Sequence, residues 1–208
     1  MAKKKKEEAA PQELNLKFEL ATVTIPVKGK TSLIMSRFSE KAKQQIQEIG
    51  AAESGIKQGG KKKNIISPED QYANSIHYMS DGVRYGFPAI GFKAAMVDAA
   101  YRVYGRKMTD MKAFFYVNAD DGDLVEIHGT PRMREDMVRV GGMTKVAAPR
   151  YRAEFPDWSA NVTITYVVGA ITEKELATYL QASGTCCGVG EWRPEKGGSH
   201  GMYELHSN

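Results

Sequence analysis

The stretch RYRAEFPDWSANVTITYVVGAITEKELATYLQASG, residues 150–184, contains two strand patterns and a capped helix in direct succession. Residues 150–155 and 162–168 are rich in aromatic and β-branched side chains, which favours strands. Thr172 and Glu175 then have the spacing of a capping box, which predicts the start of a helix. Strands that lead into a helix in this way are typical of an α+β domain with an antiparallel sheet.

Three more helices are predicted before this stretch. Ser39 can cap a helix over residues 39–49, and the Ser-Pro-Glu-Asp sequence that starts at Ser67 favours a short helix to about Tyr78. The clearest helical pattern covers residues 90–104, where apolar side chains recur every three or four positions. The expected helix ends are glycines: Gly50, Gly105 and Gly184.

Further strands are predicted at both ends of the chain and in its middle. They cover residues 14–27, 111–118, 124–127 and 202–205. The first strand changes its alternation near Ala21 and Thr22, which indicates a bulge, and its Pro26 is expected at a sheet edge or strand end. The simplest packing of this order is a ferredoxin-like (RRM-like) α+β fold, with an antiparallel sheet, helices on one face and a long inserted hairpin at about residues 129–150.

Length and composition indicate one domain in a reducing compartment. Of the 208 residues, 1–13 are expected to form a disordered basic arm, and 14–208 a single domain. No apolar run has the length of a membrane span, and the only cysteines, Cys186 and Cys187, are adjacent. We therefore expect a cytoplasmic protein whose cysteines are buried and structural. The net charge of +4 favours a polyanionic partner only weakly, because the lysine-rich N-terminus supplies part of it.

The segment GVGEWRPEKGGSHG, residues 188–201, combines glycines with an aromatic ring and cations. Gly188 and Gly190 can bring the backbone close to a phosphate, Trp192 can stack on a base, and Arg193 and Lys196 supply charge. The alternative is that the glycines only turn the chain into its last strand. The segment matches neither a P-loop nor a dinucleotide fingerprint, so no nucleotide cofactor is expected.

A second segment, residues 129–152, alternates arginines with methionines. Its cations could follow a nucleic-acid backbone, while the apolar side chains insert between bases or contact a neighbouring subunit. An ordinary surface hairpin with methionines in the core is the alternative. The candidate cations are Arg132, Arg134, Arg139, Lys145, Arg150 and Arg152.

Three segments together resemble a known family. The sequence YGFPAIGFKAAM, residues 85–96, resembles the proline, glycine and lysine motif that opens a helix in the RAMP superfamily, whose members form the backbone of CRISPR effector complexes. Residues 130–155 are similar to that family's arginine-bearing insertion and the acidic-aromatic strand after it, and residues 188–201 are similar to its glycine-rich signature loop. The spacing of the first glycines and the length of the loop differ from the family pattern, which leaves open a divergent relative from a phage or mobile element.

The resemblance covers roughly residues 14–205 and implies a function. A ferredoxin-like palm and an inserted thumb would hold single-stranded RNA or DNA independently of base sequence, and copies would assemble head to tail into a filament. Lys28, Lys30, Arg37 and Lys93 would then lie along the same groove.

No catalytic or metal site is predicted. Some backbone subunits of the family cut RNA with an aspartate after the first strand, whereas this chain has no acidic residue between Pro26 and Arg37. The run Asp120 to Asp123 reads as a solvated turn, and His77 and His128 as structural or surface residues. Two other functions remain open: an interaction protein that assembles without nucleic acid, and a metal-dependent nuclease.

Overall fold

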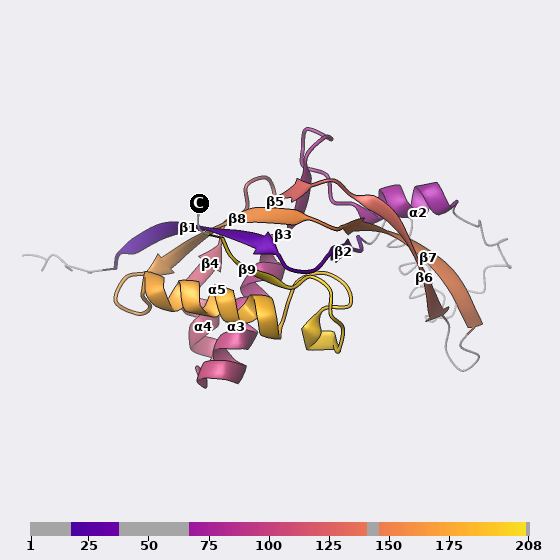
Figure 1. Ribbon diagram of the computed structural model, residues 1–208. Coiled ribbons are helices and arrows are strands. Elements are labelled where there is room, and N and C mark those ends of the chain that lie inside the picture. Colours follow the sequence, from indigo (N-terminus) through magenta and orange to yellow (C-terminus); the bar gives the residue numbers. More distant parts are fainter. Residues whose placement is uncertain (1–17, 38–66, 141–145, 207–208) are drawn as a thin grey trace, which may run out of the picture.

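The computed structural model describes residues 18–37, 67–140 and 146–206 (Figure 1). The predicted arm over residues 1–13, the helix over 39–49 and Lys145 lie outside these residues.

The larger of two sheets has the strand order β3-β5-β8-β1-β9, and β4 pairs with β8 beside β5. Every pairing in it is antiparallel. The order matches a ferredoxin-like sheet, with β1 and β8 in the centre, β9 on one side and the interrupted strand β4–β5 on the other. The bounds are β1 (Leu20–Gly29), β3 (Tyr85–Pro88), β4 (Phe115–Val117), β5 (Leu124–Gly129), β8 (Trp158–Val167) and β9 (Tyr203–Leu205).

Strand β1 alternates without interruption. Its register against β8 runs from Leu20 opposite Val167 to Lys28 opposite Ser159 with no slip, so the predicted bulge is wrong. The change of phase has a simpler cause: Phe18 and Leu20 are 69% and 49% exposed and do not belong to the core-facing set. Pro26 lies inside β1, just beyond the last residue that pairs with β9, and its carbonyl accepts a hydrogen bond from the His206 amide.

Helices α3, α4 and α5 lie together on one side of this sheet (Figure 1). Their bounds are α3 (Ala89–Tyr104), α4 (Met108–Phe114) and α5 (Glu173–Cys186). Helix α3 ends at Gly105 in the left-handed conformation, and α5 begins with the predicted capping box. The core lies between these helices and the sheet, and its largest fully buried side chains include Phe92, Phe115 and Tyr203. The fold is therefore α+β and ferredoxin-like, as predicted.

A smaller sheet with the order β2-β7-β6 extends from the end of the larger one (Figure 1). It contains the predicted hairpin, formed by β6 (Arg132–Val140) and β7 (Val146–Phe155), and the short strand β2 (Leu33–Met35). Helix α2 (Pro68–Ser75) packs against β7, and the Ser75 hydroxyl accepts a hydrogen bond from the Ala153 amide at 2.8 Å. Both β2 and this helix connect the hairpin to the rest of the chain.

Several predicted boundaries need correction. Residues 108–114 form helix α4, which replaces the first part of the strand predicted over 111–118. Met111 packs into the core beside α3, and a short apolar run does not distinguish a helix from a strand. The helix that starts at Ser67 ends at Ser75 rather than near Tyr78. Gly184 does not end α5 but lies inside it, where an added Cβ would collide with the Tyr203 carbonyl. Strands β2 and β3 were not predicted, because three or four residues carry too little pattern.

Candidate nucleic-acid interface

A cavity of about 230 Å³ lies where four separate segments of the chain meet, one of which contributes only His77. Ser36 follows β2, residues 87–95 form the turn into α3 and its first turns, and residues 188–195 belong to the glycine-rich loop. Two of these are the segments that the sequence singled out at residues 85–96 and 188–201. The fold therefore brings both motifs to one place.

The glycine-rich loop is held against β2 by main-chain hydrogen bonds. The Glu191 amide donates to the Ile34 carbonyl at 2.9 Å, and the Gly201 amide donates to the Ser32 carbonyl at 2.8 Å. A Cβ at Gly190 would stand 2.5 Å from the Ile34 carbonyl oxygen, so a glycine is required for this approach. These glycines therefore serve the packing of the loop on β2, which is the structural alternative considered for them.

Trp192 is held in an unusual conformation and is open to solvent. Its φ of 56° is the only positive value among the described residues other than glycine, and its side chain is 48% exposed. A left-handed conformation costs a bulky residue about 1–2 kcal/mol. Its carbonyl accepts a hydrogen bond from the His200 amide at 3.0 Å, which helps to hold this conformation. Its neighbours Glu191 and Arg193 both line the cavity, whereas Trp192 itself is not among the lining residues.

The loop's own cations are paired within the loop. Arg193 contacts the Glu195 carboxylate at 2.7 Å and donates to the Gly190 carbonyl at 3.0 Å. Lys196 lies 3.4 Å from the same carboxylate. Burial raises the pKa of Glu195, but hydrogen bonds and charge from Arg193, and then from Lys196, hold this pKa below its ordinary value. Arg193 and Lys196 therefore share one carboxylate.

A second hollow of about 580 Å³ continues from the cavity and shares Ser36, His77 and Pro88 with it. Arg37 lines this hollow, is exposed and has no carboxylate partner among the described residues. Burial and the nearby Arg37 charge lower the pKa of His77, although Asp123 opposes them, so the imidazole is neutral at pH 7. His77 follows the end of α2 and does not lie on a helix as predicted, because the helix stops at Ser75.

The arginines near the base of the hairpin converge on one buried carboxylate. Glu154 is 4% exposed and contacts Arg132 at 2.9 Å, Arg134 at 3.0 Å and the Ser32 hydroxyl at 2.8 Å. Burial raises the pKa of Glu154, yet the hydrogen bonds from Ser32, Arg132 and Arg134 together hold it below its ordinary value. The Ser32 hydroxyl also lies 3.0 Å from His200 Nδ1 in the glycine-rich loop. A single hydroxyl thus links the hairpin to the loop.

The remaining hairpin cations differ in accessibility. Arg152 is only 9% exposed and reaches Asp136 at 3.5 Å, and its Nε has no hydrogen-bond partner among the described residues. Its guanidinium is therefore covered and does not face a ligand in this conformation. Arg150 is exposed, and for Arg139 only the backbone of β6 is described.

The other predicted lysines do not line the cavity. Lys28 is exposed on β1 among the residues that face away from the core, and Lys30 pairs with Glu204 at 3.2 Å. Lys93 donates to the Lys112 carbonyl at 2.9 Å and lines a different groove, between α3 and α4. Lys28 and Lys30 thus do not line the cavity, and Lys93 lies in an adjoining groove that shares Ala94, Arg193 and Glu195 with it. Gly188, Gly190 and Arg193 come together around the cavity.

Sequence reasoning missed Ser32, Ser36 and the role of Glu154. Nothing in the local sequence distinguishes the two serines, because their positions depend on β2, which was not predicted. Glu154 carried a signal: a carboxylate that alternates with core residues in a strand must find cationic or hydrogen-bonding partners.

Other chemistry-bearing residues have structural partners. Asp120 accepts a hydrogen bond from the Glu126 amide at 2.8 Å, and Asp121 accepts one from the Ser80 hydroxyl at 2.7 Å. Burial, followed by the Asp98 charge, raises the pKa of Cys187 to about 12. Cys187 is buried as predicted, but the prediction is wrong for Cys186, which is exposed. Within the described ranges, no group of three or more His, Cys, Asp or Glu side chains could hold a metal ion. None of the described helices combines the length and apolar character that a membrane crossing requires.

Comparisons with known proteins give likeness of fold. No protein-family model matches the chain, and no curated protein matches its sequence. A chain in the cryo-EM structure of the Type III-B Cmr-beta bound to cognate target RNA aligns with a TM-score of 0.50 and 10% identity, over 90% of this chain and 59% of that one. The crystal structure of Cmr6 from Pyrococcus furiosus aligns over 90% of this chain and 99% of that one at 11% identity, but its TM-score of 0.44 is too low to support an argument. The chain thus spans 59% of the length of the first of these chains and is similar to it in fold.

Proposed function

We propose that this chain binds single-stranded nucleic acid without base specificity, does not cut it, and works as a repeated subunit. The observation that carries the proposal is Trp192, an exposed residue kept in a costly left-handed conformation between two residues that line the cavity. Strained, exposed residues are concentrated at functional sites, because the surrounding structure must hold them there for a purpose other than stability. An exposed indole is a stacking surface for any nucleobase.

Two exposed arginines outside the glycine-rich loop could contact a phosphate backbone. Arg37 lies in the hollow that continues from the cavity and has no carboxylate partner in the described part of the chain. On the hairpin, Arg132 contacts Glu154 through Nε while its side chain stays 66% exposed, which leaves its terminal nitrogens open to a phosphate. Backbone contacts of this kind attract nucleic acid regardless of sequence.

The likeness of fold supports the same class of ligand by analogy. The first structure is of a complex bound to its target RNA. Because one fold hosts many functions, this likeness raises the expectation of nucleic-acid binding, while the site argument rests on Trp192, Arg37 and Arg132. The repeated-subunit part of the proposal comes from the resemblance to the RAMP superfamily.

Salt-dependent affinity tests the binding proposal. We expect labelled single-stranded RNA and DNA of mixed sequence to bind, with an affinity that falls steeply between about 50 and about 200 mM salt. Arg37→Ala and Arg132→Ala should each reduce the salt slope by up to about 1. Arg102→Ala is the matched control, because Arg102 is 56% exposed but pairs with Asp98 on α3, away from the cavity. Unchanged affinity in both test variants, or no binding at low salt, would overturn the proposal.

The absence of cutting needs its own test. We expect labelled RNA and single-stranded DNA to remain intact with the protein and Mg²⁺ or Mn²⁺. Metal-dependent cleavage that disappears on Asp121→Asn or Asp123→Asn would instead favour the nuclease alternative.

A second function is favoured by the internal ion pairs. Arg134, Arg152 and Arg193 all contact carboxylates of this chain, as expected of a protein that assembles without nucleic acid. That protein would change its size with concentration and would ignore added oligonucleotide, whereas the proposed function predicts larger assemblies on added oligonucleotide.

A further inference from the structure

The first part of β1 has a free edge. On one side the whole strand pairs with β8, but on the other side only residues 27–29 pair, with β9. In an antiparallel ladder the main-chain groups of successive residues point to opposite sides of the strand. The Glu19 carbonyl accepts from the Val168 amide on the β8 side, and the Pro26 carbonyl accepts from the His206 amide on the β9 side. Even-numbered residues of β1 therefore point their N–H and C=O groups away from β8.

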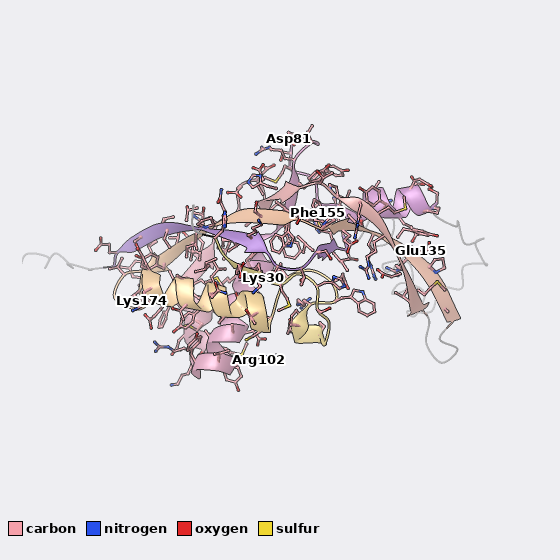
Figure 2. The ribbon with its side chains drawn as sticks, in the orientation of Figure 1. Lys30, Asp81, Arg102, Glu135, Phe155 and Lys174 are labelled. Carbon is pink, nitrogen blue, oxygen red and sulfur yellow. The ribbon has the colours of Figure 1, made fainter. Side chains whose placement is uncertain are left out.

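The free edge consists of the main-chain groups of Leu20, Thr22 and Thr24. In the described part of the chain no strand lies beside these residues on the side away from β8. Figure 1 shows this part of β1 at the end of the main sheet opposite the β6–β7 hairpin. In Figure 2, Lys174 of α5 marks the same end of the molecule and Glu135 marks the hairpin. The edge is therefore far from the arginines of the hairpin.

The core beside this edge is incompletely covered. Val27, which β9 flanks, is 1% exposed. Ala21, Val23 and Ile25 face the core in the same way but are only partly buried. A strand added at the edge would cover apolar surface of these residues and would pair the free main-chain groups at the same time.

The edge lacks the features that keep free edges unpaired. Natural proteins place charged side chains or bulges on exposed edge strands, which prevents pairing with another chain. Residues 20–25 contain no charged side chain, and β1 runs along β8 without a bulge. Strand β6, which forms an edge of the smaller sheet, carries Arg134, Glu135 and Asp136 in succession. Of these two long edges, only that of β1 is suited to pairing with another strand.

A second copy of β1 fits this edge. An uncharged edge pairs best with another uncharged strand, because a charged side chain brought against it would lose water without gaining a partner. Phe18 and Leu20, at the start of the edge, are 69% and 49% exposed. Antiparallel pairing centred on Leu20 places the two Leu20 residues opposite each other and Phe18 of each copy opposite Thr22 of the other. This register covers both exposed apolar side chains.

We propose that two copies of this chain pair their β1 strands edge to edge, antiparallel and centred on Leu20, so that one sheet runs through both molecules. Because both copies use the same surface, the contact closes as a twofold dimer and does not extend into a longer assembly. The inference goes beyond the proposed function, since it uses none of the residues that would bind nucleic acid.

Sedimentation equilibrium of the full chain without oligonucleotide tests the contact. The wild type should form dimers that dissociate on dilution. Thr22→Pro removes an N–H that points away from β8, so it should keep the fold but weaken dimerisation at least about 10-fold. Thr22→Val is the matched control: both variants lose the hydroxyl contact with Thr165 at 3.0 Å, but the valine keeps the N–H and should dimerise like the wild type.

A second variant covers the case in which the proline variant does not fold. Leu20→Lys changes a half-exposed side chain, so the fold should tolerate it, but it brings two like charges together at the centre of the contact and should also weaken the dimer. A wild type that stays monomeric at the highest attainable concentration, or Leu20→Lys that dimerises like the wild type, would overturn the proposal.

Disulfide trapping tests the register. In a Cys186→Ser background, which removes the exposed thiol, Leu20→Cys should cross-link into dimers and nothing larger, because the Cα atoms of a directly opposite pair lie about 5.5 Å apart. Thr24→Cys is the control, since the two Thr24 residues would lie about 27 Å apart along the paired strands. Equal cross-linking of both variants, or multimers larger than dimers, would contradict the proposed contact.

Hydrogen exchange identifies any other occupant of the edge. The Thr22 amide should be protected in the dimer and should exchange quickly once the protein is diluted to a monomer. Protection that persists in the monomer would mean that another segment of the same chain covers the edge, and the proposal would fail. Oligonucleotide affinity measured on the same variants tests the proposed function separately: dimers without binding reject only that function, and binding without dimers rejects only this inference.

Discussion

Replacing Trp192 separates the stability of the glycine-rich loop from its affinity. The side chain is 48% exposed, so about half of its surface is covered by protein. A fully covered tryptophan buries about 150–250 Å², so Trp192→Ala gives up about 100 Å², or at most about 2.5 kcal/mol of the free energy of unfolding. Trp192→Gly loses the same ring but removes the left-handed strain at φ 56°, so it should be more stable than Trp192→Ala by about 1 kcal/mol.

Affinity should not follow this pattern. A base stacked on the ring contributes about 1–3 kcal/mol, so both variants should bind single-stranded oligonucleotides about 5- to 150-fold more weakly, and the glycine variant should regain none of that loss. Trp192→Phe, which keeps an aromatic ring, should bind more tightly than either. Urea unfolding followed by Trp158, which is 2% exposed and reports on the core, gives the stabilities, and fluorescence anisotropy gives the affinities. Wild-type affinity in Trp192→Ala, or affinity that recovers with stability in Trp192→Gly, would refute the stacking argument.

Three further outcomes follow from buried contacts. Glu154→Gln should release Arg132, while Arg134 keeps its ion pair with Asp136 at 2.9 Å, so that oligonucleotide affinity at low salt rises and its salt slope steepens. Unfolding should become easier by about 2–3 kcal/mol, less than for a fully buried pair because Arg132 is largely exposed. The folded state lowers the pKa of Glu154, so its carboxylate stabilises the fold fully above the ordinary pKa of 4.5 and loses this contribution as the pH falls below 4.5. The urea midpoint of the wild type should therefore drop more over this pH range than the urea midpoint of Glu154→Gln. Gly184→Ala should lower the free energy of unfolding by about 1–3 kcal/mol despite the better helix propensity of alanine, because the new methyl group meets the Tyr203 carbonyl. A melting temperature equal to that of the wild type would show that this contact can relax.

The sequence predicted the elements whose signals are local. The capping box at Thr172 and the left-handed end of α3 at Gly105 are both confirmed, since each depends on residues within one turn. The alternating arginines and methionines of residues 129–152 likewise predicted a hairpin, which the structure contains as β6 and β7.

What depends on distant contacts was not predictable. Gly184 looked like a helix end because nothing in its neighbourhood indicates that Tyr203 lies against it. The convergence of Arg132 and Arg134 on Glu154 was also hidden, since the pairing needs the register of β6 against β7. The sequence thus identified which residues could contact a polyanion, but not which of their charges are already compensated within the fold.

Strand β2 has a consequence for how freely such a sequence can vary. Its three residues, all fully buried, receive the glycine-rich loop on one side through the Ile34 carbonyl and pair with β7 of the hairpin on the other. The spacing of the loop and the hairpin is therefore set by peptide groups, which every amino acid carries. Side chains around the glycine-rich loop and the hairpin can therefore change while the spacing of these two segments stays the same. Chains with this fold can thus differ at nine positions in ten, as in the alignment at 10% identity, and still keep the same backbone arrangement.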